Sequence, residues 1–180
     1  MLEDKLLVWK LKRGNSDALR QIYEKYKRDL LALALALSND KGAAEDVVHD
    51  VFVSFVQFAE KLQLRTSLKS YLLSCIANRV RNLHREKCQQ AIRLDAAEAI
   101  SSDSDGPEQM AIASEELHRI GLAMVQLSYE QREVIILHLQ GGMRFRAIAL
   151  SQGVSINTIQ SRYRYGLNKL RSLLNGEAEK

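Results

Sequence analysis

The chain has 180 residues, one proline, nine glycines and a formal net charge of +4, with a sequence pI of about 9.1. A hydrophobic content of 46% is typical of a protein that buries a core. No segment keeps the alternating pattern of a strand, so we expect an all-α fold. No apolar run reaches the ~20 residues of a membrane span, and the charged start does not resemble a signal peptide. We therefore expect a cytoplasmic protein without membrane insertion.

Residues 1–90 predict four helices that close one domain. Glycine, asparagine and aspartate mark breaks at 14–15 and 39–42, and a polar, basic loop is expected at 61–67. The expected helices cover residues 3–12, 16–38, 43–59 and 68–90. The residues expected to be buried on the third helix are Ala44, Val47, Val48, Val51, Phe52, Phe55, Phe58 and Ala59. Those expected to be buried on the fourth are Leu68, Leu72, Cys75, Ile76 and Leu83.

Composition changes after residue 90. Basic residues outnumber acidic ones in residues 1–90 and 127–175, whereas acidic residues predominate in 91–126. The serine, aspartate, glycine and proline at 101–107 are typical of a solvated linker, and Pro107 suits the first turn of a following helix. We therefore expect two small helical domains, residues 1–90 and 113–176, joined by an acidic flexible linker at 91–112.

The strongest motif, a helix–turn–helix, lies in the second domain. Ser128 begins a Ser-x-x-Gln capping box, and Gly153 and Ser155 separate a short helix at 145–152 from a longer one. On the longer helix, the residues expected to pack inward are Ile159, Tyr163, Gly166, Leu167, Leu170 and Leu174. Those expected to face outward are Asn157, Gln160, Ser161, Arg164, Asn168 and Arg171. An amide, hydroxyl and guanidinium front fits a DNA major groove. The alternative is an ordinary helical hairpin.

An acidic stripe lies on the third expected helix. Asp46, His49 and Asp50 share one face because they are spaced at i, i+3 and i+4. This stripe is either a solvated helix surface or a docking patch for a basic protein partner. Histidine and carboxylates at this spacing could also hold a metal, but the neighbouring helices offer no matching ligands, so we expect no metal site.

A basic stripe lies on the fourth expected helix. It consists of Asn78, Arg81, Asn82 and Arg85, with Arg65, Lys69 and Tyr71 nearby. Cations that hold phosphates and aromatic rings that stack on bases are typical of single-stranded nucleic-acid binding. The alternatives are a soluble basic helix face and, for Tyr71, a place in the core.

Catalysis is not expected. The sequence has no nucleophile–base arrangement, no glycine-rich phosphate loop and no CxxC motif, so we predict neither an enzyme nor a bound cofactor. Cys75 and Cys88 fall on one expected helix at a separation of roughly 20 Å, which is too far for a disulfide. Unpaired thiols suit a reducing cytoplasm.

These segments together resemble the sigma-70-type RNA polymerase sigma factors of the extracytoplasmic-function (ECF) group. The segment 44–52 resembles the helix of this family that docks on the clamp of the polymerase β′ subunit. The resemblance implies that Asp46, His49 and Asp50 contact the clamp, with His49 standing where the family usually has glutamine. The segment 71–78 resembles the helix that recognises and melts the −10 element. The −10 DNA residues implied are Arg65, Lys69, Tyr71, Asn78, Arg81, Asn82 and Arg85.

The segments 127–134 and 156–170 resemble the fourth region of the family, which binds the −35 element and the polymerase β flap. The −35 residues implied are Arg144, Asn157, Gln160, Ser161, Arg162, Arg164 and Tyr165, with Arg144 and Arg162 near phosphates. Arg146–Ala147 replaces an acidic pair that is usual in the family.

The resemblance implies a transcription initiation factor whose partners are core RNA polymerase, promoter DNA and an anti-sigma factor. Two other functions stay open at this point. One is a helix–turn–helix regulator that binds DNA without polymerase. The other is a sigma mimic that sequesters an anti-sigma factor.

Overall fold

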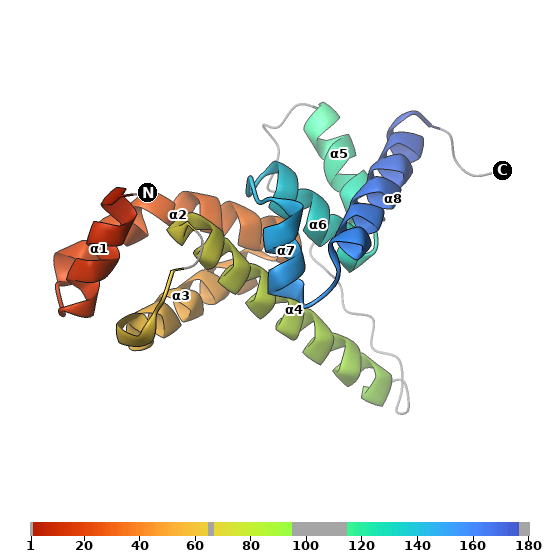
Figure 1. The fold of residues 1–180 in the computed structure, drawn as a ribbon. Coiled ribbons are helices and arrows are strands. Elements are labelled where there is room, and N and C mark those ends of the chain that lie inside the picture. The colour runs from red at the N-terminus through yellow and green to blue at the C-terminus, as the bar shows by residue number, and fades with distance from the viewer. Residues whose placement is uncertain (1, 65–66, 95–114, 177–180) are drawn as a thin grey trace.

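The computed structural model describes residues 2–64, 67–94 and 115–176 of the chain. Within these ranges every regular element is helical (Figure 1), which confirms the all-α prediction. The elements are α1 (Leu2–Lys12), α2 (Ser16–Ser38), α3 (Lys41–Gln57), the 3-10 turn η1 (Ala59–Lys61), α4 (Leu68–Leu94), α5 (Glu115–Val125), α6 (Tyr129–Leu139), α7 (Phe145–Gln152) and α8 (Ile156–Leu174). Residues 95–112 of the predicted linker lie outside the described ranges. None of the described helices is long and apolar enough to cross a membrane.

Side-chain caps mark the starts of several described helices, and the cap at Asp40 starts α3 two residues before the predicted position. Asn15 accepts a hydrogen bond from the backbone N–H of Ala18 at 2.9 Å, and Asp40 accepts one from Ala43 at 3.0 Å. Ser128 and Ser155 cap α6 and α8 in the same way. Each cap satisfies a backbone donor that the first helical turn leaves free, so the local sequence defines these starts.

The first helical group is a bundle in which α2 packs against both α3 and α4. Its largest fully buried side chains include Ile22, Leu33, Leu68 and Ile76. One prediction for this core is wrong, because Phe58 is 60% exposed. The helix α3 ends at Gln57 and Phe58 is its C-cap, so the helical spacing that would have turned this ring inward stops one residue too early.

The helix α1 is attached to the bundle by a buried carboxylate. Asp4 accepts hydrogen bonds from the Tyr26 hydroxyl at 2.8 Å and from Nζ of Lys25 at 2.9 Å. At its other end, Nζ of Lys12 donates to the backbone carbonyl of Leu62 at 2.7 Å. The helix therefore also holds the start of the segment that leads into α4.

The second helical group places α8 across α5, α6 and α7. The turn between α7 and α8 uses Gly153 at φ 67, in the left-handed region that favours glycine. Within α8, Gly166 is buried where a Cβ would lie 2.8 Å from Cδ1 of Ile135. This residue therefore allows α8 to approach α6 closely.

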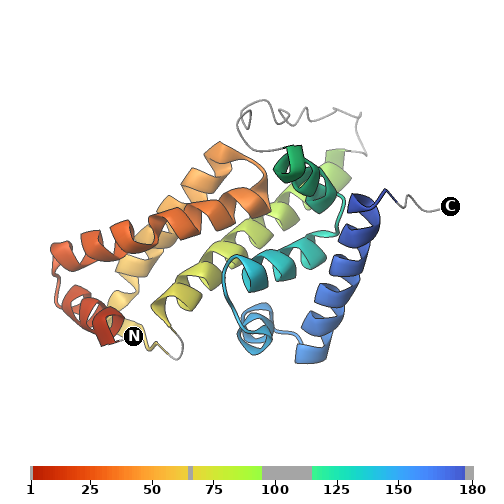
Figure 2. The same cartoon turned by 90° about the horizontal axis from the view of Figure 1, so that it is seen from above.

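The two groups pack directly against each other. The helix α2 lies against α6, and α4 lies against α7. Figure 2 shows α6 and α7, in cyan and blue, beside the yellow-green α4. A single apolar cluster contains buried residues of both groups, such as Ile76 and Val80 with Val134 and Leu137. The surface of α4 that faces this cluster is therefore covered by the second group.

Candidate nucleic-acid interface and docking surface

The helix α8 has the two faces that its sequence predicts. Ile159, Gly166 and Leu170 are buried, while Tyr163, Leu167 and Leu174 are partly buried. On the opposite face, Asn157, Gln160, Arg164 and Tyr165 are exposed and Ser161 is partly exposed. The Arg164 guanidinium lies 5.2 Å from the centre of the Tyr165 ring, which is within the range of a cation–π contact. Amide, hydroxyl, phenol and guanidinium groups thus share one accessible surface.

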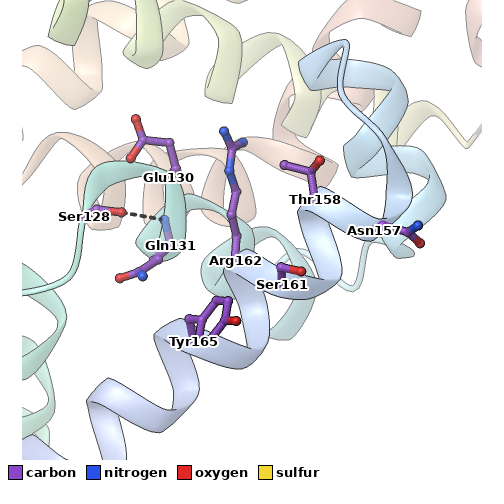
Figure 3. Close-up of a pocket in the computed structure, with 8 residues that line it drawn as sticks. All are labelled: Ser128, Glu130, Gln131, Asn157, Thr158, Ser161, Arg162 and Tyr165. Carbon is purple, nitrogen blue, oxygen red and sulfur yellow. Dashed lines mark hydrogen bonds between the residues drawn. The ribbon is translucent and has the colours of Figure 1, made fainter.

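This surface continues into an open hollow between α8 and the N-terminus of α6 (Figure 3). Its lining is polar apart from the Tyr165 ring, and consists of Ser128, Glu130, Gln131, Asn157, Thr158, Ser161, Arg162 and Tyr165. A hydrogen bond with its own backbone and the charge of nearby Arg162 help to lower the pKa of Glu130. The hollow therefore combines one carboxylate and one guanidinium with neutral polar groups.

Two predicted phosphate contacts in this region differ in their surroundings. Arg144 is exposed at the N-cap position of α7. Arg162 is only partly exposed, and its Nη1 donates a 2.9 Å hydrogen bond to Oε1 of Gln152. Arg144 is thus accessible in this arrangement, whereas Arg162 is engaged within the protein.

Near the start of α4, two residues predicted to bind single-stranded DNA contact other side chains of the protein. Nζ of Lys69 forms an ion pair with Asp29 at 2.5 Å. The Tyr71 ring is half-buried, 6.3 Å from the ring of Phe55, and burial raises its pKa to about 12. Tyr71 therefore packs against the core in this arrangement, which was the alternative left open by the sequence. Arg65 lies outside the described residues.

Farther along α4, the basic stripe is divided between solvent and the second helical group. Asn82 and Arg85 are exposed, as predicted. Asn78 and Arg81 are only partly exposed, because Arg81 is bonded both to Glu133 of α6 and to Asn78. Nε of Arg81 donates to Oε2 of Glu133 at 3.2 Å and Nη2 donates to Oε1, while Nη1 donates to Oδ1 of Asn78 at 2.9 Å. The predicted outer stripe is therefore fully exposed at Asn82 and Arg85 and partly covered at Asn78 and Arg81.

Glu133, which the sequence analysis did not single out, is the buried partner of Arg81. Its side chain is 1% exposed, and burial raises the pKa of its carboxyl although the hydrogen bonds and charge of Arg81 oppose this. It directly precedes the run from Val134 to Leu137, in which every residue is buried. A helix that is apolar on all sides is buried on all sides, and this pattern was the signal that Glu133 would lie inside.

The acidic stripe of α3 is accessible. Asp46 and His49 are exposed, and Asp50 is partly exposed. Asp50 is also paired with Arg79 of α4, whose Nη2 donates to Oδ2 at 2.8 Å. Among the residues that the structure describes, no cluster of histidine, cysteine or carboxylate side chains could hold a metal ion. The stripe is therefore accessible, as both a solvated helix surface and a docking patch require.

The two cysteines lie along α4 without forming a disulfide. Cys75 is partly buried, and burial raises the pKa of its thiol. Cys88 is exposed, with Sγ 3.8 Å from Nδ1 of His84.

These faces define a class of helical DNA-binding proteins in which a helix–turn–helix unit accompanies a second unit with its own charged surfaces. Residues 22–88 match the family model described as sigma-70 region 2, and residues 117–170 match the model described as sigma-70, region 4. The chain therefore belongs to the sigma-70 family of RNA polymerase sigma factors, in the ECF group. It is a transcription initiation factor that directs RNA polymerase.

Three relatives share about a quarter of their residues with this chain. The RNA polymerase sigma factor CnrH of Cupriavidus metallidurans is 26% identical, over 98% of this chain and 97% of its own length. The ECF sigma factor SigK of Mycobacterium bovis is 27% identical, over 87% of this chain and 86% of its own. The ECF sigma factor SigX of Bacillus subtilis is 26% identical, over 83% and 80% respectively.

Two solved structures have the same fold. The sigma factor RpoE bound to the anti-sigma factor NepR, from Bartonella quintana, is 28% identical with a TM-score of 0.71, covering 87% of this chain and 96% of that one. CnrH in complex with the cytosolic domain of CnrY has a TM-score of 0.73 and covers 98% and 99%. At 22% identity, this second likeness supports the fold alone.

Proposed function

We propose that the chain binds core polymerase through α3, contacts −35 duplex DNA through α8, and opens −10 DNA with α4. The observation that carries this proposal is the separation of three chemically different faces onto three helices. The face of α3 is acidic, the face of α4 is basic, and that of α8 is rich in amides and hydroxyls. In this proposal RNA synthesis belongs to core polymerase, and this chain supplies binding surfaces in the bacterial cytoplasm.

The −35 contact is supported by the exposed front of α8. An α-helix fits the major groove, where arginine recognises guanine and amides recognise adenine. Gln160 and Arg164 are exposed and lie one helical turn apart, so both can reach base edges from one docking position. Arg144, which is exposed at the start of α7, would hold a neighbouring phosphate.

The −10 contact is supported by α4. Asn82 and Arg85 are already exposed, and Arg81 offers a third polar group once the second helical group has moved away. Cations of this kind hold the phosphates of a single strand, and the part of the Tyr71 ring that is not packed against the core would stack on a base. The proposed units are residues 1–90 for docking and −10 opening, and 113–176 for −35 binding.

The docking contact is supported by the exposed carboxylate of Asp46 and its neighbours His49 and Asp50. By analogy with the NepR complex, we further propose that an anti-sigma factor holds the protein until transcription is required. Apolar side chains exposed on α5, such as Ile120, Leu122 and Val125, offer such a partner a surface on the second helical group.

The docking proposal is tested by charge reversal. Asp46→Arg is expected to reduce the affinity for purified core polymerase by more than tenfold, because one buried charge contact at an interface is worth 2–5 kcal/mol or more. Asp17→Arg is the matched control, since Asp17 is exposed on α2, outside the three proposed faces. Equal affinities of the two variants for polymerase would contradict the assignment of α3.

A further inference from the structure

Arg81 and Glu133 form the main charged contact between the two helical groups. The Nε and Nη2 groups of Arg81 both donate to the carboxylate, and 25% of the Arg81 side chain is exposed, against 1% of the Glu133 side chain. A buried carboxylate is tolerated only when it is paired and hydrogen-bonded. Glu133 therefore depends on Arg81 for as long as α6 lies against α4.

The Nε and Nη2 donors of Arg81, which form a two-pronged fork, could bind a DNA phosphate in the same way. A guanidinium presents its two parallel N–H groups to a carboxylate or to a phosphate with similar geometry. In this structure the Nε–Nη2 fork of Arg81 is occupied by Glu133, and Nη1 is occupied by Asn78. A DNA phosphate can bind to this fork only after Glu133 has left it.

Apolar contacts with the second helical group cover the face of α4 next to Arg81 and keep DNA away from it. Leu73, Ile76 and Val80 are at most 3% exposed, in one cluster with Val134 and Ile148 of the second group. At the turn after α6, a Cβ on Gly141 would lie 3.3 Å from Cδ1 of Leu73. DNA can therefore reach this face only when the two groups separate.

Neighbouring polar groups surround the Arg81–Glu133 contact, and two of them weaken the interface between the helical groups. Arg162 and Gln152 both act to lower the pKa of Glu133, against the effect of burial. Both belong to the second helical group, so they move with Glu133 when the two groups separate. Beside the contact, the Tyr129 hydroxyl and Nε of Arg132 are buried without a hydrogen-bond partner among the described residues. Such groups weaken an interface, so this one is less stable than a permanent core.

We propose that the Glu133 carboxylate is an intramolecular competitor of promoter DNA for the guanidinium of Arg81. While the pair is intact, the chain is closed and its −10 surface is inhibited. When the groups separate, Arg81 binds a phosphate of the single strand. This inference rests on the proposed function of α4, and it adds a residue of the second group that controls access to that surface.

The test measures binding of a fluorescently labelled single-stranded oligodeoxynucleotide to the full chain alone. Glu133→Gln is expected to bind roughly tenfold more tightly than the unchanged protein, because it frees one guanidinium–phosphate contact. The dependence of log K on log salt should steepen by about 0.7 for that contact. Solution X-ray scattering should show a larger radius of gyration for Glu133→Gln.

Two controls isolate the pair. Glu86→Gln removes the same charge from an exposed position of α4 and should leave affinity and radius unchanged. In a chain that already carries Arg81→Gln, adding Glu133→Gln should give no further gain, because the competed guanidinium is absent. A gain of equal size in that background would show only a loss of negative charge, and would overturn the proposal.

Three other results would also overturn it. These are equal affinities for Glu133→Gln and Glu86→Gln, no detectable oligonucleotide binding by either, or loss of helical circular dichroism in Glu133→Gln, since each group must stay folded after separation. Failure of the proposed function itself is distinguishable, because it appears as an absence of transcripts from the unchanged chain with core polymerase.

Discussion

Arg79 of α4 donates two hydrogen bonds to the same oxygen of Asp50 on α3, from Nη2 at 2.8 Å and from Nε at 3.2 Å. Both side chains are nearly half exposed, at 43% and 48%. An ion pair at this exposure contributes only about 0–1 kcal/mol to stability. Its main effect is therefore to orient the Asp50 carboxylate, which links the proposed docking surface to the helix proposed to open DNA.

Asp50→Arg is expected to abolish polymerase binding while sparing the fold. The new cation faces Arg79, so we expect a loss of only about 0.5–1 kcal/mol in the free energy of unfolding. Arg79→Gln breaks the pair but keeps the carboxylate, and it should retain polymerase binding at a similar small cost in stability. Urea unfolding and polymerase binding by the two variants check this. If Arg79→Gln loses binding as completely as Asp50→Arg, the carboxylate is not the contact.

Arg164→Ala is expected to weaken recognition of a cognate −35 duplex by about 1–3 kcal/mol and to relax specificity at one position, as the loss of a base-edge contact does. Arg144→Ala should instead weaken binding to all sequences about equally and lower the salt slope by about 1, as the loss of a phosphate contact does. Affinities for a set of duplexes at several salt concentrations separate the two. A sequence-independent loss for Arg164→Ala would assign it to a phosphate.

Gly166→Ala is expected to destabilise the second helical group. The added Cβ would lie 2.8 Å from Cδ1 of Ile135 and 3.2 Å from Cβ of Gln131, so α8 must shift away from α6. Overpacking of this kind costs about 1–3 kcal/mol. The matched control is Gly121→Ala on α5, where a Cβ meets nothing within 4 Å. That change should stabilise the chain by about 0.5–1 kcal/mol. Thermal unfolding of the two variants should show shifts of opposite sign.

Asp4→Asn is expected to lower stability at neutral pH but not in acid. Burial raises the pKa of Asp4, but the hydrogen bonds of Lys25 and Tyr26 outweigh it and lower the pKa below the unfolded value. The stabilisation is therefore fully present above the unfolded pKa of about 3.9 and is lost as the pH falls through the folded-state pKa. We expect a loss of about 1.5–3 kcal/mol at pH 7, the value of a hydrogen bond to a charged group.

The difference between Asp4→Asn and the unchanged protein should shrink as the pH falls below 4, when it is followed by thermal unfolding. Asp17→Asn, at an exposed site on α2, serves as the control. A difference in stability that is independent of pH would show that the Asp4 charge does not attach α1.

The helix starts could be predicted from the sequence because their causes are local. Asn15, Ser128 and Ser155 cap helices through backbone donors three residues away. The two faces of α8 follow from helical spacing in the same way. The place of Arg81 could not be predicted, since its partner Glu133 is 52 residues away in sequence. Periodicity shows which residues share a face, but it does not show which distant element covers that face.

Phe58 illustrates a second limit. Its spacing from Phe55 and Ala59 suggests a buried side chain, and both of those neighbours are buried. Because α3 ends at Gln57, the backbone at Phe58 has left the helical direction on which this spacing depends. An error of a residue or two in a predicted helix boundary is thus enough to assign an exposed aromatic ring to the core.

The measurement that tests the account most directly is run-off transcription with purified core polymerase, this chain and a library of promoters. We predict transcripts from a subset of promoters that share both a −35 and a −10 sequence, and their loss with Asp46→Arg. No transcript from any promoter, in the presence of a chain that remains helical, would contradict the central claim.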